Sequence, residues 1–294
     1  MFERRGALME KLVLVARKLE WLWLLGLIGY IGNPLFKLFF LSALFMFLDP
    51  IFLQSLLQIV GVFYISIANR FNLPSKENYV CKGDYTLPFL GKWTVINGGV
   101  EKELSHSWGI FTQRYAYDFV ILDDEGKSFA GDNKIADSYY CYEKAIVAPY
   151  DGVVVKISNK HKDSRVDGQK AYCDALDIRG NYIVIQHYEH EYSVIAHILQ
   201  NSFSVTVGDK VRRGQSIAKC GNSGNTSEPH VHFQLQNGKS FFLSSGLPIA
   251  FSNINAQAKT NYELADKRSC ANNLQTVDNK TYIGRGLEVE SLNE

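Results

Sequence analysis

Residues 180–197 have the sequence GNYIVIQHYEHEYSVIAH, which contains two short apolar runs separated by a charged segment. The runs are Tyr182–His187 and Tyr192–His197. Apolar and polar residues alternate along them, and both are rich in β-branched and aromatic side chains, which pack well on a pleated surface. We therefore expect two consecutive β-strands in this stretch.

Runs of the same kind recur along the chain, at residues 93–96, 117–121, 152–157 and 230–235. Clusters of Gly, Asp, Asn and Ser separate them, and no useful stretch of helical period lies between Cys81 and Leu243. The fold class expected for residues 75–251 is mainly β, an antiparallel β-sandwich or flattened barrel. The polar tail at 252–294 shows no pattern, so we expect it to be loosely ordered or disordered.

The N-terminal quarter is strongly apolar. Residues 21–68 are almost continuously hydrophobic, with breaks at residues 32–34 and 49–50. About 20 apolar residues span the hydrocarbon of a bilayer, so residues 19–70 predict a helical membrane segment with the lipid bilayer as its partner. The alternative is a buried helical hairpin in a soluble protein, which the small amount of polar surface disfavours. A cleaved signal peptide is not indicated, because no cleavage site is visible.

Residues 1–18 are a basic amphipathic flank with five Lys and Arg residues, typical of an interfacial helix or a cytoplasmic flank. This excess of positive charge favours a cytoplasmic N-terminus. The break at Pro34 permits either two or three crossings. Two crossings would return the rest of the chain to the cytoplasm, whereas one or three would place it outside.

Composition excludes several classes of protein. Thirty-one Lys and Arg residues against 30 Asp and Glu give a formal net charge of +1, so no nucleic-acid partner is expected. Five cysteines are too few for a disulfide scaffold in 294 residues. None of them has the C-x-x-C spacing of a cysteine metal site.

The candidate chemistry lies in histidines and one aspartate. An extended backbone places His230 and His232 on the same face of a strand, and His197 ends another run. Asp118 lies inside an apolar run, where a carboxylate is costly unless it is exposed, paired or metal-bound. His106 lies in the loop before it. Two His and one Asp around zinc leave one position for water, and two further imidazoles can handle a proton and an oxyanion.

Residues 93–248 resemble the lysostaphin/LytM-type zinc endopeptidases, which cut peptide cross-bridges of bacterial cell walls. The resemblance rests on four segments in the family's order: Val147–Val154, Gly180–His197, Val207–Ala218 and Gly221–Phe233, the last containing SGNTSEPHVHF. It implies a duplicated-hybrid-motif β domain with bound Zn²⁺. Carried onto this sequence, it makes His106, Asp118 and His232 the zinc ligands. It makes His197 and His230 the catalytic residues and leaves open which one is the base.

Two features depart from the family pattern. The first ligand pair of the family has three intervening residues, whereas eleven separate His106 and Asp118. Asp118 matches the family's strand, and no other histidine precedes it. Glu228 replaces the small residue that usually stands before the Pro-His pair, at a position where it either alters specificity or lies on the rim.

The expected function is that of a membrane-anchored zinc metalloendopeptidase with its catalytic domain on the outer face. It would cleave peptide cross-links of peptidoglycan by metal-activated water. The alternative is a non-catalytic LytM-like module that binds cell wall or activates a separate hydrolase, although such proteins typically lose ligands and this chain retains all five candidates. A biotinyl or lipoyl carrier domain is disfavoured because it needs an exposed Lys flanked by Met, and no Met follows Met46.

Overall fold

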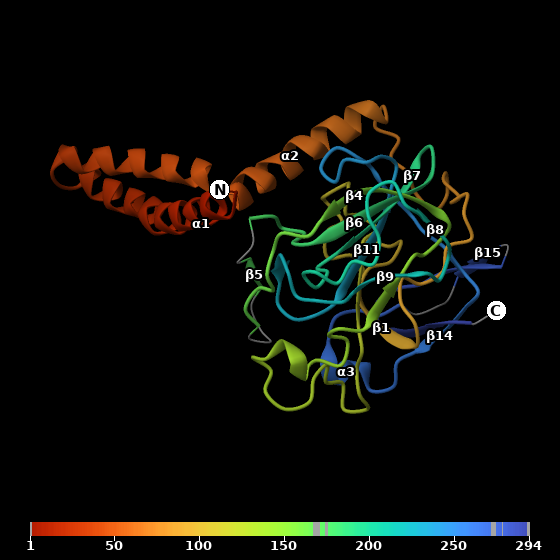
Figure 1. Cartoon of the computed structure of the whole chain (residues 1–294). Helices are drawn as coiled ribbons and strands as arrows, with labels where there is room; N and C mark the ends of the chain where they lie inside the picture. The colour runs from red at the N-terminus through yellow and green to blue at the C-terminus, as the bar shows by residue number, and fades with distance from the viewer. Residues whose placement is uncertain (1, 167–170, 174–175, 272–274, 278, 293–294) are drawn as a thin grey trace. The chain divides into compact units, whose positions relative to one another are not determined.

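The computed structural model describes residues 2–166, 171–173, 176–271, 275–277 and 279–292. The chain divides into two compact units (Figure 1). The first contains residues 1–57 and 176–178, and the second contains residues 58–175 and 179–294. Helices make up most of the first unit, and all the strands of the described residues lie in the second.

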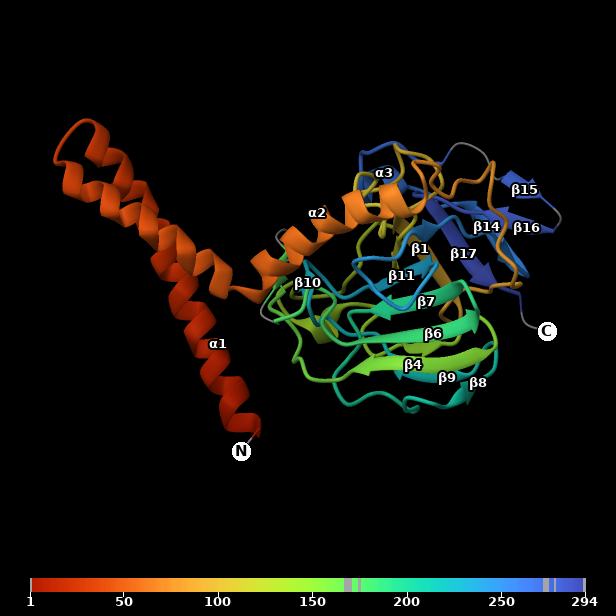
Figure 2. The ribbon, with the colours of Figure 1, turned by 90° about the horizontal axis from the view of Figure 1, so that it is seen from above.

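The N-terminal unit consists of helices with short breaks. They are α1 (Phe2–Leu19), the 3₁₀ helices η1 (Glu20–Tyr30) and η2 (Pro34–Leu48), and the beginning of α2 (Pro50–Ala68). The turn between η1 and η2 falls at the predicted break: Asn33 Oδ1 accepts the Leu35 N–H at 2.9 Å, and Pro34 occupies the first helical position. The two 3₁₀ helices therefore form an antiparallel hairpin, visible in Figure 2.

An ion pair joins the two ends of this hairpin. Arg17 Nε lies 2.7 Å from Asp49 Oδ2, and Arg17 Nη2 donates to Asp49 Oδ1 at 3.0 Å. The same Oδ1 accepts the N–H of Ile51 at 2.9 Å and so caps the start of α2. The end of α1 and the end of η2 are thus held side by side.

One helix in the described part of the chain, α2, is long and apolar enough to cross a membrane, judged by length and composition. It has 19 residues and a mean hydropathy of 1.9, and only 11% of its apolar stretch is buried. Helix η2 is apolar but shorter. The membrane segment at 19–70 stays a prediction.

The main sheet has ten antiparallel strands, and its path has two free ends, so the predicted barrel is not closed. Along the path the strands are β14 (Ile254–Ala258), β17 (Leu287–Ser291), β1 (Lys92–Asn97), β2 (Tyr117–Val120), β11 (Val231–Gln236), β7 (Glu191–Ala196), β6 (Tyr182–Tyr188), β4 (Gly152–Ser158) and β8 (Lys210–Val211). Strand β12 (Gly246–Leu247) pairs with β11. The mainly antiparallel β prediction is confirmed, and each of the six predicted runs is a strand whose ends agree within one residue.

Smaller elements surround the main sheet. Three short ladders pair β3 (Ala145–Val147) with β9 (Ser216–Lys219), β5 (Tyr172–Cys173) with β10 (Asn225–Thr226), and β16 (Lys280–Tyr282) with both β13 (Phe251–Ser252) and β15 (Gln275–Val277). Two short helices are η3 (Ala136–Ser138) and α3 (Tyr262–Ala265).

The prediction of a loosely ordered tail is wrong for the described residues. Strand β17 pairs with β1, placing Val289 opposite Trp93, and β14 pairs with the other edge of β17. Leu287 and Val289 are buried and alternate with Glu288 and Glu290, which is the period of a half-buried strand. The signal was present but spans only five residues of an otherwise polar segment.

The core covers one face of the main sheet. Phe89 stacks on Trp93 with ring centroids 4.5 Å apart and meets Phe119 edge-on at 4.9 Å. On β11, Val231 and Phe233 belong to the same buried cluster. Because side chains alternate along a strand, the residues between them face the opposite side of the sheet, where the candidate site lies.

Candidate active site

The pairing register brings the site residues into one row across the sheet. His232 on β11 lies opposite Asp118 on β2, and Asp118 lies opposite Asn97 on β1. Residues directly opposite each other have Cβ atoms about 5 Å apart, so their side chains meet. The register of β1 shifts between Val95 and Asn97, and this bulge puts Asn97 rather than Ile96 opposite Asp118.

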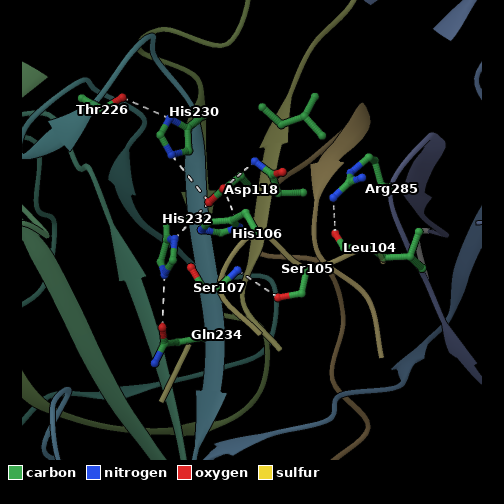
Figure 3. Close-up of polar contacts among 12 residues, drawn as sticks. Leu104, Ser105, His106, Ser107, Asp118, Thr226, His230, His232, Gln234 and Arg285 are labelled. Carbon is green, nitrogen blue, oxygen red and sulfur yellow. Dashed lines mark hydrogen bonds and ion pairs between the residues drawn. The ribbon is translucent and has the colours of Figure 1, made fainter. Parts of the chain in front are cut away.

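Asp118 is the centre of the cluster (Figure 3). Its Oδ1 lies 2.9 Å from His232 Nδ1 and 3.6 Å from His230 Nε2. Its Oδ2 lies 3.6 Å from His106 Nδ1 and accepts a hydrogen bond from Asn97 Nδ2 at 3.1 Å. One buried carboxylate therefore faces three imidazoles and one amide.

The imidazoles keep this carboxylate ionised. Burial acts to raise the pKa of Asp118, but the neighbouring His106, the hydrogen bond from His232 and the proximity of His230 together lower it well below its ordinary value. The pKa of His106 is lowered, chiefly by burial. Its side chain is still 31% exposed and forms the open edge of the cluster.

The long loop before Asp118 folds back on itself, which explains how His106 reaches the site. Ser105 Oγ donates to Arg114 O at 2.9 Å and joins the two ends of the loop. Arg114 Nε donates to Trp108 O at 3.1 Å, and the guanidinium lies 4.4 Å from the ring centre of Phe111. The eleven intervening residues therefore form a closed loop, and this loop places His106 beside Asp118.

His197 ends β7 in the left-handed region, with φ of 62°. Its N–H donates to Arg179 O at 3.1 Å, and its Nδ1 lies 2.7 Å from Ser223 O. A carbonyl can only accept, so Nδ1 carries the proton and Nε2 is left as an acceptor. The His197 and His230 rings are 4.6 Å apart. Burial, and then the neighbouring His230 and His232, lower the pKa of His197 well below its ordinary value.

The close packing at Gly180 explains why a glycine begins the segment Gly180–His197, which resembles the family. Its φ is +61°, and a Cβ there would lie 2.2 Å from the carbonyl carbon of Ser223. Only glycine allows the segment around Ser223 to approach this closely. The close approach fixes the carbonyl that holds His197.

A row of side chains along β11 fixes the protons of His232. Gln236 Nε2 donates to Gly238 O at 2.6 Å. Gln234 Nε2 donates to Gln236 Oε1 at 2.8 Å and to Thr112 O at 3.1 Å. These bonds turn Gln234 Oε1 toward His232 Nε2, 3.1 Å away. Because Oε1 has no proton, His232 Nε2 is the donor.

Both ring nitrogens of His232 face oxygen acceptors in this structure. Its Nε2 donates to Gln234, and its Nδ1 donates to the ionised Asp118. Burial acts to lower the pKa of His232, but the hydrogen bond and charge of Asp118 and the bond to Gln234 raise it above its ordinary value. The result is a buried ion pair between His232 and Asp118.

The ring nitrogens of His230 are arranged differently from those of His232. Its Nδ1 lies 2.8 Å from Glu228 O, a carbonyl, so Nδ1 donates, and in the neutral form of the ring Nε2 bears the lone pair. That lone pair faces Asp118 Oδ1 at 3.6 Å. Two acceptors that face each other in a buried place are unfavourable unless a cation or a proton lies between them.

The structure brings all five predicted residues together. His106, His230 and His232 surround Asp118, and the ring of His197 lies tilted against that of His230. Among the described residues, however, no three His, Cys, Asp or Glu side chains have the arrangement of a metal site.

Sequence reasoning missed three residues that contact the cluster. Asn97 is followed by two glycines, a sequence that is typical of a hairpin turn rather than of a site. Gln234 continues the two-residue period of His230 and His232, and this period was a usable signal. Arg268 donates to Asn97 Oδ1 at 2.9 Å from a segment that was expected to be disordered, and nothing local in the sequence indicates its position.

A β-sheet protein with histidines gathered on a buried carboxylate is the class that this fold and site define. Residues 136–242, 107 of the 294 residues, match the model of Peptidase family M23. His197, His230 and His232 lie within the match, whereas His106 and Asp118 precede it.

Two curated relatives come from Vibrio cholerae serotype O1. The chain is 44% identical over 59 residues to peptidoglycan DD-endopeptidase ShyA, covering 19% of this chain and 13% of the relative. It is 36% identical over 88 residues to peptidoglycan DD-endopeptidase ShyB, covering 28% and 19%. The chain therefore matches less than a fifth of the length of either relative.

Solved structures were also compared. A zinc containing peptidase from Vibrio cholerae gives a TM-score of 0.35 at 17% identity, covering 56% of this chain and 39% of that one. The catalytic domain of lysostaphin from Staphylococcus simulans gives 0.29 at 22% identity, covering 58% and 90%.

Proposed function

We propose that the protein is a membrane-anchored zinc metalloendopeptidase that cleaves peptide cross-links of bacterial peptidoglycan. The observation that carries the proposal is the single buried carboxylate of Asp118, which faces the nitrogens of three imidazoles at 2.9–3.6 Å. The two relatives named as peptidoglycan DD-endopeptidases support the choice of substrate.

The donor set fits zinc. Nitrogen and carboxylate donors that share a tetrahedral zinc at bonds of about 2.0 Å lie roughly 3.3 Å apart. Asp118 Oδ1 lies 2.9 Å from His232 Nδ1, and the other oxygen, Oδ2, lies 3.6 Å from His106 Nδ1. His232 would bind through Nδ1 after losing that proton, because Gln234 keeps the proton on Nε2. We assign His106, Asp118 and His232 as the ligands.

His197 and His230 would manage the proton of the reaction. Both donate Nδ1–H to a backbone carbonyl, so both present an unprotonated Nε2. One of them takes a proton from the attacking water, and an imidazole protonated in this way can then donate to the developing oxyanion or to the leaving amine. Bound zinc would supply the Lewis acid that polarises the scissile carbonyl and lowers the pKa of water.

The ion pair between Arg17 and Asp49 supports an outer location for the catalytic domain. It holds the two ends of the η1–η2 hairpin at one level, so the hairpin enters and leaves a bilayer on the same side. Helix α2 is then the segment that changes sides. With a cytoplasmic N-terminus, as the basic flank favours, the domain that follows α2 lies outside the cell membrane.

The test measures zinc content and peptidoglycan cleavage in the purified full chain. His232→Ala is expected to lose stoichiometric zinc and cleavage together. His197→Ala is expected to retain zinc and lose cleavage by about 10²–10⁴-fold, the usual contribution of general acid–base catalysis. The matched control is His190→Ala, because His190 is 70% exposed on the turn between β6 and β7, and it should change neither property.

Two outcomes would contradict the proposal. Stoichiometric zinc in His232→Ala would overturn the ligand assignment. A zinc-loaded wild type that leaves peptidoglycan intact but stimulates another hydrolase would favour the non-catalytic LytM-like module instead.

A further inference from the structure

We propose that Arg268, on the C-terminal segment, is a positioning residue for Asp118 and acts through Asn97. The inference rests on the proposed function, because it concerns how the chain prepares Asp118 for zinc. Arg268, Asn97 and Asp118 all lie outside the residues that match the family. The support for the carboxylate therefore comes from parts of the chain that the family match does not cover.

A continuous set of hydrogen bonds links Arg268 to the carboxylate. Arg268 Nη1 donates to Asn97 Oδ1 at 2.9 Å, and Arg268 Nη2 donates to the carbonyl of Ile96 at 3.3 Å. Asn97 Nδ2 in turn donates to Asp118 Oδ2 at 3.1 Å. The guanidinium thus holds the side chain of Asn97 and the bulged backbone beside it.

The bond from Arg268 decides which way the Asn97 amide faces. An arginine has donors and no acceptors, so the atom of Asn97 that faces it must be Oδ1. The NH₂ group then faces Asp118, where it donates. Without Arg268 the amide could rotate and present its oxygen to the carboxylate, which would repel it. Arg268 therefore ensures that Oδ2 of Asp118 is satisfied by a donor and held in one orientation.

Arg268 is itself held from two directions. Asp266 contacts its guanidinium through Nε at 2.8 Å and Nη2 at 2.6 Å, and also accepts its backbone N–H at 2.9 Å. The neighbouring Ser269 is held by Arg285, whose Nη1 donates to Ser269 O at 3.2 Å. An exposed ion pair alone stabilises little, but here the backbone on both sides of Arg268 is fixed as well.

Arg285 ties this segment to the loop of His106. It is 3% exposed, and its Nη2 donates to Leu104 O at 2.7 Å, two residues before His106 (Figure 3). Its Nη1 donates to Glu103 O at 3.2 Å. The same guanidinium therefore holds the segment that carries Arg268 and the loop that carries His106. The C-terminal segment thus supports both Asn97 and the His106 loop, which approach the same oxygen, Oδ2 of Asp118.

The experiment measures the zinc affinity of the full chain by competition with a chelator, together with thermal unfolding of the metal-free protein. Arg268→Gln removes the donors to Asn97 and Ile96. We expect zinc to bind about 10–100-fold more weakly, the usual effect of losing a partner that orients a ligand. The unfolding midpoint should match the wild type, because Arg268 is half-exposed. Arg212→Gln, at an exposed arginine away from the site, is the matched control.

A double-mutant cycle tests whether Arg268 acts through Asn97. Asn97→Leu should weaken zinc binding at least as much as Arg268→Gln, and the double variant should be no worse than Asn97→Leu alone. Additive losses would overturn the inference, and so would wild-type zinc affinity in Arg268→Gln. A wild type that binds no zinc would instead refute the proposed function, so the two failures are distinguishable.

Discussion

Backbone carbonyls determine where the protons of the site lie. Gly238 O accepts from Gln236, which leaves only one orientation for each glutamine amide along β11. The series of hydrogen bonds ends at His232. Its Nε2 faces Gln234 Oε1, which can only accept, so the proton lies on Nε2. His230 is set in the same way by Glu228 O. The chemistry of each imidazole thus depends on main-chain atoms as much as on its charged neighbours.

His187 makes the folded state sensitive to acid. Its Nδ1 lies 2.8 Å from Asp151 O and its Nε2 lies 2.8 Å from Ser193 Oγ. Burial is the main cause that lowers the pKa of His187 to about 4. The unfolded chain binds a proton near pH 6.5, so this contribution to stability is present above that pH and is lost as the pH falls toward 4.

The wild type is therefore expected to lose about 2 kcal/mol through His187 between pH 7 and pH 5. Urea unfolding at the two pH values measures the loss. His187→Gln should show a smaller drop than the wild type, by about that amount, and His190→Gln should drop as the wild type does. An equal drop in His187→Gln and the wild type would show that another group is responsible.

At the scale of elements, local sequence patterns predicted individual strands but not which strands pair with each other in the sheet. Periods of two residues are readable where they run for six residues, as in β6 and β7. The five-residue β17 was missed because its alternation lies within a polar tail. The pairing of β17 with β1 joins residues almost 200 positions apart, and no local rule carries that information. Arg268 and Asn97 were missed for the same reason.

Pairing of β17 with β1 should depend on Val289. This side chain is 1% exposed, opposite Trp93. Val289→Asp buries a carboxylate without a partner, so we expect the free energy of unfolding to fall by 3 kcal/mol or more, by order of magnitude. Urea unfolding followed by tryptophan fluorescence measures it. Glu290→Ala, one position along the same strand, should cost well under about 1 kcal/mol. Equal effects would mean that β17 does not depend on the burial of Val289.

At the scale of the whole molecule, the side of the membrane is testable by cysteine labelling. Cys81 and Cys141 are buried and should not react in the folded protein. Glu189 is 85% exposed on the turn between β6 and β7. We expect Glu189→Cys to react with a membrane-impermeant maleimide in intact cells. Labelling only after lysis would place the domain in the cytoplasm and make peptidoglycan the wrong substrate.

The place of β17 in the sheet also bears on biosynthesis. Strand β1 emerges from the ribosome early, but its neighbour β17 follows only when residues 287–291 have been made. Until then Asn97 and Asp118 lack the arginines that hold them. A nascent chain would therefore contain every histidine of the site before it contains the C-terminal strand and arginines that hold the site in place.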